Sequence, residues 1–194
     1  KIDPPTKEEI DLMFPGQYLL SAIQMANLTD SYIKQLCNKK ITAIAYEFLR
    51  DNENSLVIIR SMSEIAGSSA VLIGAEYLSN VSGGKGELLG GISGIPPTEV
   101  VVIGAGTVGE YAVRTAVGLG AGVKVFDNSP AKLRRLQDHL GMRIFTSVMQ
   151  PNILNKALRS ADLAIGALRN DMGRSPSVVS EEMVSNMKEG AVIV

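Results

Sequence analysis

Residues 99–109 read EVVVIGAGTVG, and this stretch decides how the rest of the sequence is interpreted. The β-branched run before Gly104 predicts a buried strand, and helical spacing begins near Val108. In a strand–turn–helix of this kind, Gly104 permits the sharp bend, Gly106 leaves room for a pyrophosphate, and Gly109 lets the helix pack closely. Thr107 and Val108 stand at the start of the helix, whose free N–H groups attract phosphate. The stretch therefore predicts a dinucleotide-binding turn.

An acidic residue follows the next predicted strand, Val123–Phe126. This residue, Asp127, stands 18 positions after Gly109. A carboxylate at that point accepts hydrogen bonds from the adenosine ribose and repels a 2′-phosphate, which favours NAD over NADP. S-adenosylmethionine, FAD, or a glycine-rich turn without a ligand are the alternatives.

Strands and helices alternate after Pro97, which predicts right-handed crossovers and a parallel sheet covered on both faces. The expected fold class is α/β, a Rossmann-type doubly wound parallel sheet. Ser129 before Pro130, and Ser180 before two glutamates, are expected helix caps. The expected strands are Val100–Ile103, Val123–Phe126, Arg143–Thr146, Leu163–Ile165 and Ala191–Val194, and the expected helices are Val108–Leu119, Pro130–Leu140, Asn152–Ser160 and Glu181–Met187.

The first third of the chain has its own strand–helix–strand order, typical of part of a second α/β domain. The pattern predicts a helix over Thr6–Met13, a strand over Gln17–Met25, a helix over Asp30–Asn38 and a buried strand over Ile41–Phe48. Small and apolar residues at helical spacing predict a long packed helix over Met62–Leu78. The glycine-rich segment Gly83–Gly94 has the composition of a linker, with a ligand-side loop as the alternative.

Composition excludes several classes of protein. The 194 residues are 45% hydrophobic with a net charge of −1, which gives no broad footprint for nucleic acid or an anionic membrane. A single cysteine and a single histidine leave neither a disulfide nor a zinc cluster, so we expect no metal and a cytoplasmic setting. No apolar run approaches the roughly 20 residues needed to span a bilayer. The missing initial Met and the terminal AVIV strand indicate a fragment.

Few side chains outside the turn are candidates for catalysis. His139 falls in the second crossover helix, on the flank of the predicted sheet, and we interpret it as a solvated helix residue. Cys37 is interpreted as a small buried residue, and Lys34, Lys39 and Lys40 as a solvated face. No catalytic residue is assigned, because a dinucleotide-binding unit alone does not hold a substrate.

Several stretches resemble, in the same order, the alanine dehydrogenases and the related NAD-binding subunit of proton-translocating transhydrogenase. They are Pro15-Gly16-Gln17, ITAIAYE at 41–47, MSEIAG at 62–67, the Gly83–Pro97 segment, VVVIGAGTVG at 100–109 and ADLAIGA at 161–167. The resemblance covers nearly the whole chain.

The resemblance implies an NAD domain inserted into a discontinuous substrate-type domain. Residues 1–58 would be a remnant of the outer domain, 59–82 a connecting helix, and 83–194 a truncated NAD-binding Rossmann domain in which the Gly83–Gly94 segment is ordered. It also implies which residues bind NAD: Met62, Ser63, Gly104, Gly106, Thr107, Val108, Gly109, Asp127, Asn128, Lys132, Ala167 and Leu168.

Two departures from the family pattern bear on the substrate. Gln24 stands where such alanine dehydrogenases have a catalytic histidine, and a glutamine cannot act as an acid or base near neutral pH. Arg169–Gly173 stands where a Pro-Gly pair is expected. The family's substrate lysine and arginine would precede Lys1, and its nicotinamide-side aspartate would follow Val194.

The resemblance implies an NAD-dependent oxidoreductase that transfers hydride between NAD and the α-carbon of an amino acid, converting L-alanine to pyruvate and ammonia through an imino acid. Its substrate would be a small molecule, and the protein would be a homo-oligomer without membrane insertion. The alternatives are the NAD(H) module of a transhydrogenase, as Gln24 suggests, and a non-catalytic NAD-binding module.

Overall fold

The structure, a computed structural model, describes residues 1–23, 29–168 and 177–194. The chain divides into two compact units, Lys1–Met62 and Ser63–Val194. Helix α3 (Val57–Leu78) crosses from the first unit into the second. The three-part division given by the resemblance stays a prediction.

The first unit is a β–α–β arrangement preceded by a short helix. It contains α1 (Lys7–Leu12), β1 (Tyr18–Ser21), α2 (Asp30–Asn38), β2 (Thr42–Ala45) and the 3₁₀ helix η2 (Tyr46–Phe48). Strands β1 and β2 are parallel, with Tyr18 opposite Thr42. A small core joins Ile10, Leu19 and Leu36 from two helices and a strand. The sequence therefore predicted the element order of this unit correctly.

Three expectations for the first unit were wrong. The strand expected to be buried, Ile41–Phe48, is the short β2, whose first three residues are exposed, because two strands alone cannot cover both of their faces. Cys37 is exposed rather than buried, since its neighbour Leu36 is the α2 residue that turns into the core. Lys39 is not simply solvated: its ammonium donates hydrogen bonds to the carbonyls of Asp11 and Met13, where α1 ends.

The second unit is a five-stranded parallel sheet with the order β5-β4-β3-β6-β7. Ser129 and Ser180 cap their helices as expected. After α3 the elements are η3 (Asn80–Ser82), β3 (Glu99–Ile103), α4 (Thr107–Gly118), β4 (Gly122–Phe126), α5 (Pro130–Leu140), β5 (Phe145–Ser147), α6 (Pro151–Ser160), β6 (Leu163–Gly166), α7 (Glu181–Ser185) and β7 (Val192–Ile193).

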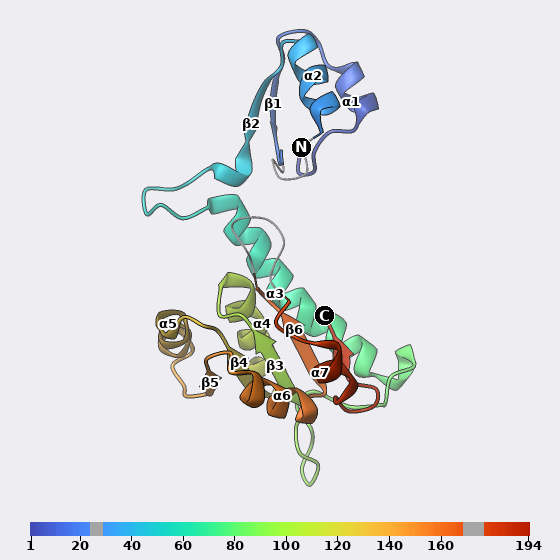
Figure 1. Ribbon diagram of the computed structural model, residues 1–194, viewed down its shortest axis with the longest axis vertical. Helices are drawn as coiled ribbons and strands as arrows, with labels where there is room; N and C mark the ends of the chain where they lie inside the picture. Colours follow the sequence, from blue (N-terminus) through green and yellow to red (C-terminus); the bar gives the residue numbers. More distant parts are fainter. Residues whose placement is uncertain (24–28, 169–176) are drawn as a thin grey trace. The chain divides into compact units, whose positions relative to one another are not determined.

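Helices cover both faces of this sheet (Figure 1). Side chains alternate along β3, so Val100 and Val102 join the core under α3, α4 and α5. Val101 and Ile103 point to the other face, where α6 and residues of α7 pack. All four side chains are at most 4% exposed, as expected for a central parallel strand. The sequence-based prediction of a doubly wound α/β fold is confirmed.

The first strand of the second unit, β3, lies at its centre. The chain adds β4 and then β5 on one side of β3, and afterwards crosses to add β6 and β7 on the other side. Such a reversal opens a crevice beyond the carboxyl ends of the two central strands, where ligands of open α/β sheets bind. In this chain the turns that follow β3 and β6 stand at that edge of the sheet.

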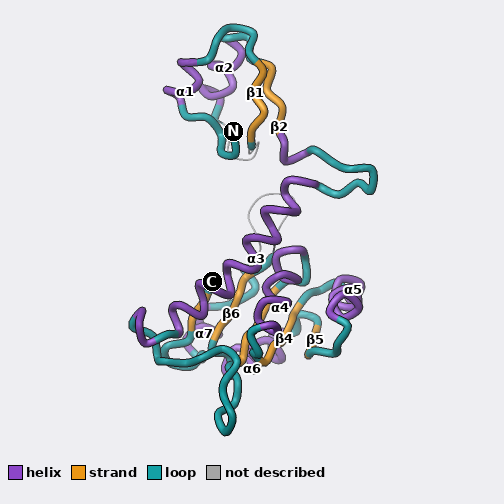
Figure 2. The backbone as a smooth tube through the Cα atoms, turned by 180° about the vertical axis from the view of Figure 1, so that it is seen from behind, coloured by secondary structure: helices purple, strands orange, loops and turns teal. Residues whose placement is uncertain are grey.

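Helix α3 packs lengthwise on the second unit through glycines and apolar residues. A Cβ on Gly67 would lie 2.2 Å from the Val108 oxygen, and one on Gly74 would lie 2.5 Å from the Leu163 side chain. Figure 2 shows α3 running beside β6 and α4. Of the described helices, α3 alone is long and apolar enough to cross a bilayer, by length and composition only, so the expectation that no run reaches this length was wrong.

The glycine-rich segment Gly83–Gly94 is ordered and lies at the edge where the strands begin. Its Lys85 ammonium is 2.7 Å from Asp162, directly before β6. The side chain of Leu89 is 3% exposed, and its oxygen accepts a hydrogen bond from the Thr98 N–H. The rest of the segment projects as a narrow hairpin closed by a bridge between Ile92 and Ile95 (Figure 2). The segment is neither a loose linker nor a ligand-side loop, because the ligand edge of a parallel sheet is the opposite one.

Candidate functional site: the glycine-rich turn after β3

The turn between β3 and α4 needs glycine at two positions for different reasons. Gly104 has a φ of +117°, and a Cβ there would lie 2.4 Å from the Ala167 oxygen in the neighbouring turn. A Cβ on Gly109 would lie 1.8 Å from the Gly104 oxygen. Glycine at these positions allows the two turns and the start of α4 to pack backbone against backbone.

At position 106 the reason for glycine is different, because the space beside this residue is open. Gly106 caps α4 in an extended conformation, with φ −76° and ψ −168°, and no described atom lies within 4 Å of a Cβ built there. Among the described residues, the backbone N–H groups of Gly106, Thr107 and Val108 donate no hydrogen bond. Open space beside unpaired donors at the positive end of a 12-residue helix fits a diphosphate.

Asp127 lies at the carboxyl end of β4, beside the turn, and is 6% exposed. Its Oδ2 accepts a hydrogen bond from the Ala105 N–H at 2.8 Å, and its Oδ1 accepts one from the Ser129 N–H at 2.8 Å. A carboxylate has about four lone-pair sites, so two remain for ribose hydroxyls. The structure thus adds a role that the sequence did not reveal, because Asp127 also fixes the glycine-rich turn.

Ala167 lies against Gly104, since a Cβ on Gly104 would lie 2.4 Å from the Ala167 oxygen. Its N–H donates to the Ile103 oxygen at 2.8 Å, which joins the turn after β6 to the end of β3. Leu168 packs into the core on the α6 face of the sheet. Asn128 accepts a hydrogen bond from the Met149 N–H at 3.1 Å, so its amide holds the turn after β5.

The remaining residues that the sequence predicts to bind NAD lie on helices α5 and α3 rather than in the turn. Lys132 is exposed on the first turn of α5, where its N–H bonds to the Ser129 hydroxyl. Ser63 lies on α3 one turn before Gly67, on the face that meets Val108. Met62 belongs to the first unit. The two departures from the family pattern, Gln24 and Arg169–Gly173, fall outside the described residues.

Two polar side chains beside the turn, Arg135 and Glu110, were missed by sequence reasoning. The Arg135 guanidinium donates to the Ala105 oxygen at 3.3 Å. Glu110, in the first turn of α4 and 9% exposed, accepts hydrogen bonds from Arg114 and lies 3.0 Å from Nδ1 of His139. His139 is exposed on α5, as expected, and also has a carboxylate partner in Glu110. Helical spacing could have placed Arg135 and His139 on one face of α5, since they are four residues apart.

The strongest charge cluster lies at the opposite edge of the sheet. Asp162 is 2% exposed, and its Oδ1 is 2.7 Å from the ammonium groups of both Lys85 and Lys188. Burial alone would raise the pKa of this carboxyl, but the bonds from Lys188, Lys85 and the Glu99 N–H outweigh it and hold the pKa below its usual range. The cluster ties the glycine-rich segment and the start of β7 to the sheet, which is a structural role.

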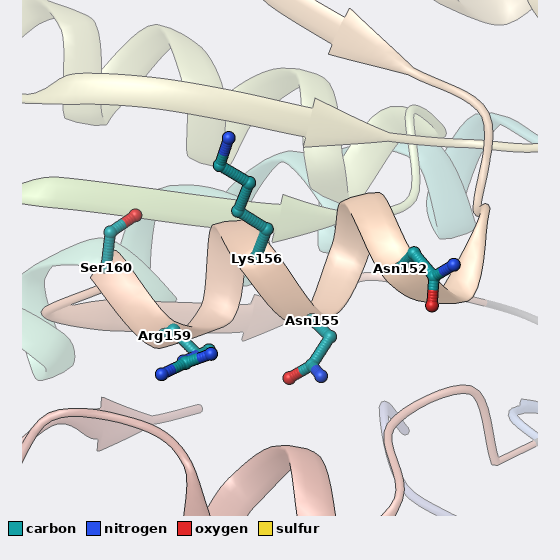
Figure 3. A pocket seen from close by; sticks show the side chains of 5 residues that line it. All are labelled: Asn152, Asn155, Lys156, Arg159 and Ser160. Carbon is teal, nitrogen blue, oxygen red and sulfur yellow. The ribbon is translucent and has the colours of Figure 1, made fainter.

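A groove of about 510 Å³ lies along α6. Figure 3 shows Lys156 and Ser160 on one side of the helix and Asn155 on the other. The described part of the chain contains no group of three His, Cys, Asp or Glu residues that could hold a metal ion. Among the described residues, the best arrangement for a dinucleotide is therefore the turn after β3. The groove is lined by Asn152, Asn155, Lys156, Arg159 and Ser160.

Two family models together match nearly the whole chain. Residues 1–66 match the family model "Alanine dehydrogenase/PNT, N-terminal domain" and residues 70–194 match "Alanine dehydrogenase/PNT, C-terminal domain". An alanine dehydrogenase of Methanococcus maripaludis is 41% identical over all 194 residues, which span 52% of its length.

Two solved structures share the fold over the whole chain. An L-alanine dehydrogenase has a TM-score of 0.92 at 37% identity, with 53% of that chain covered. A transhydrogenase from Sinorhizobium meliloti has a TM-score of 0.82 at 22% identity, with 57% covered, and this likeness concerns the fold alone. The chain spans about half the length of the relatives it matches. With both family models matched along it, the chain belongs to the alanine dehydrogenase/PNT family.

Proposed function

We propose that this chain binds NAD(H) at the turn after β3, as part of an alanine dehydrogenase-like oxidoreductase. The observation that carries the proposal is the open space at Gly106, beside unpaired backbone N–H groups and next to the Asp127 carboxylate. The diphosphate would lie against the start of α4, and the adenosine ribose would bond to Asp127. The nicotinamide would then point toward Ala167 and Leu168, across the crevice between β3 and β6.

The whole protein would convert L-alanine, NAD⁺ and water to pyruvate, ammonium, NADH and a proton. When bound, NAD supplies the hydride acceptor for this oxidation. The described residues of this chain contribute binding and orientation: N–H groups of the turn hold phosphate oxygens, and Asp127 fixes the ribose. We propose that substrate-binding residues lie in other parts of the protein, so the 194-residue chain alone would show no alanine-dependent NADH formation.

A second candidate is the NAD(H) module of a transhydrogenase, which passes hydride to an NADP-carrying partner. The fold shared with the Sinorhizobium meliloti transhydrogenase favours it, whereas the identity to alanine dehydrogenases favours the first candidate. Assay of the longer parent protein with L-alanine and NAD distinguishes them. Alanine-dependent NADH formation supports the dehydrogenase, and its absence in a protein that binds NAD supports the transhydrogenase or a non-catalytic module.

We further propose a cytoplasmic homo-oligomer that acts on a small-molecule substrate. One side of α3 packs on the second unit through Gly67, Val71, Gly74 and Leu78, which are buried. Ile92 and Ile95 on the projecting hairpin are 62% and 59% exposed, and exposed apolar groups favour self-association. Light scattering of the parent protein tests whether it forms a homo-oligomer: a monomer at all concentrations contradicts this proposal.

Isothermal titration calorimetry with NAD and NADP tests the cofactor proposal. We expect the chain to bind NAD more tightly than NADP, and Asp127→Asn to weaken NAD binding by about tenfold or more, because a charged acceptor for ribose hydroxyls is lost. Asp138→Asn, a matched change of charge on the exposed side of α5, should leave binding unchanged. Failure of the unaltered chain to bind NAD, or equal affinity for NADP, contradicts the proposal.

A further inference from the structure

The side chain of Arg135 reaches from α5 to the backbone of the glycine-rich turn. Its Nη2 donates to the Ala105 oxygen at 3.3 Å, although the residue as a whole is exposed. Its neighbour Arg134 is also exposed and, within the described part of the chain, makes no side-chain hydrogen bond or ion pair. The same helix therefore carries one arginine that contacts the turn and one that does not.

The Ala105 oxygen belongs to the same peptide unit as the Gly106 N–H. In a planar trans peptide the C=O and N–H bonds point in opposite directions. A cation that holds the Ala105 oxygen therefore directs the Gly106 N–H away from α5. It also polarises the peptide, which makes that N–H a stronger donor. The Gly106 N–H is one of the unpaired donors at the open end of α4.

The preceding peptide unit is held from the other side. Its Ala105 N–H donates to the Asp127 carboxylate at 2.8 Å, and Ala105 itself is fully buried. A carboxylate from β4 and a guanidinium from α5 thus fix the two successive peptide units on either side of the Ala105 Cα. Neither unit can rotate without losing a charge-assisted hydrogen bond.

We propose that Arg135 is a positioning residue, which orients the Gly106 N–H toward the diphosphate of the bound dinucleotide. The proposal rests on the proposed NAD(H) site and adds a residue to it. Arg135 acts through the backbone, so its contribution depends on the phosphates of the ligand and not on the adenosine.

The test compares ligands with and without the diphosphate. Calorimetric titration of the 194-residue chain with ADP-ribose and with adenosine is repeated for Arg135→Met and for the matched control Arg134→Met. We expect Arg135→Met to weaken ADP-ribose and NAD binding by about three- to tenfold, the usual effect of one hydrogen bond. Adenosine affinity and the melting temperature should not change, and Arg134→Met should behave as the unaltered chain. Arg135→Lys should restore part of the affinity, because an ammonium can still donate to the Ala105 oxygen.

Each other outcome overturns the proposal in a recognisable way. Equal losses for adenosine and ADP-ribose would mean that Arg135 only supports the fold of the turn. An effect confined to NADP would mean that the guanidinium contacts the 2′-phosphate directly. Unchanged ADP-ribose affinity in Arg135→Met refutes the positioning role while the NAD(H) site stands. If the unaltered chain fails to bind NAD or ADP-ribose, the proposed function itself falls, and the role of Arg135 falls with it.

Discussion

Replacing Gly109 with alanine tests how closely α4 packs on the turn. The added Cβ would lie 1.8 Å from the Gly104 oxygen and 2.8 Å from the Gly104 carbon. The optimal distance between non-bonded heavy atoms is about 3.5 Å. To remove the clash, the added Cβ and the Gly104 oxygen must therefore move apart by more than about 1 Å. A backbone carbonyl in a buried turn cannot swing aside as a flexible side chain does, so the start of α4 has to move.

The expected cost follows from two opposing contributions. Overpacking of this kind costs about 1–3 kcal/mol, while alanine is favoured over glycine inside a helix by about 1 kcal/mol. Since the clash involves backbone, we expect a net loss of about 1–2 kcal/mol in the free energy of unfolding. For a chain of this size that lowers the melting temperature by about 2–8 °C. Cofactor affinity should fall as well, because the N–H groups of the turn move with α4.

Gly106→Ala is the matched variant. Its Cβ would meet no described atom within 4 Å, and its φ of −76° suits any residue. Alanine is a poorer N-cap than glycine but restricts the unfolded chain more, so the free energy of unfolding should change by less than about 1 kcal/mol. The methyl group would occupy the space for the diphosphate, so NAD affinity should fall by about tenfold or more. Urea denaturation and calorimetric titration measure both quantities. The reasoning is refuted if Gly109→Ala is as stable as the unaltered chain, or if Gly106→Ala binds NAD normally.

Three further predictions concern other parts of the chain. Asp162→Asn should lower the free energy of unfolding of the second unit by about 2–3 kcal/mol, because two ammonium groups lose a buried carboxylate; a loss below about 0.5 kcal/mol would contradict this. Because the pKa of Asp162 is held below its usual range, that stabilisation should be complete above about pH 4 and lost as the pH falls through the lowered value, so urea midpoints of variant and unaltered chain should converge in acid. Exposed Cys37 should be alkylated by iodoacetamide without denaturant, and protection until unfolding would contradict its exposure.

The fold of the second unit could be predicted because each local signal agreed with the others. β-branched runs such as residues 99–103 alternate with amphipathic stretches, and caps such as Ser129 mark where helices begin. Two of the expectations that failed concern burial in the first unit. Periodicity gives the direction of a side chain but not whether another layer covers it, so Cys37 and the strand after Ile41 were assigned to a core that this unit does not form around them.

The sequence indicated those parts of the candidate dinucleotide site in which glycines and the end of a strand fix the backbone. The sequence indicated the turn and Asp127, but not that this carboxylate bonds to the Ala105 N–H. Contacts between separate helices, such as Glu110 with His139, were also missed. They depend on how α4 and α5 pack, which no local pattern encodes. The glycine-rich segment after η3 could not be placed from composition either, because its order depends on the distant Asp162.

The most direct test of the NAD(H) site is a nuclear magnetic resonance titration of the ¹⁵N-labelled chain with NAD. We expect amide shifts to concentrate at residues 104–108, 127–129 and 167–168, which the structure brings together at the carboxyl ends of β3, β4 and β6. Shifts confined to Asn152–Ser160, along the groove on α6, or no shifts at saturating NAD, would contradict it.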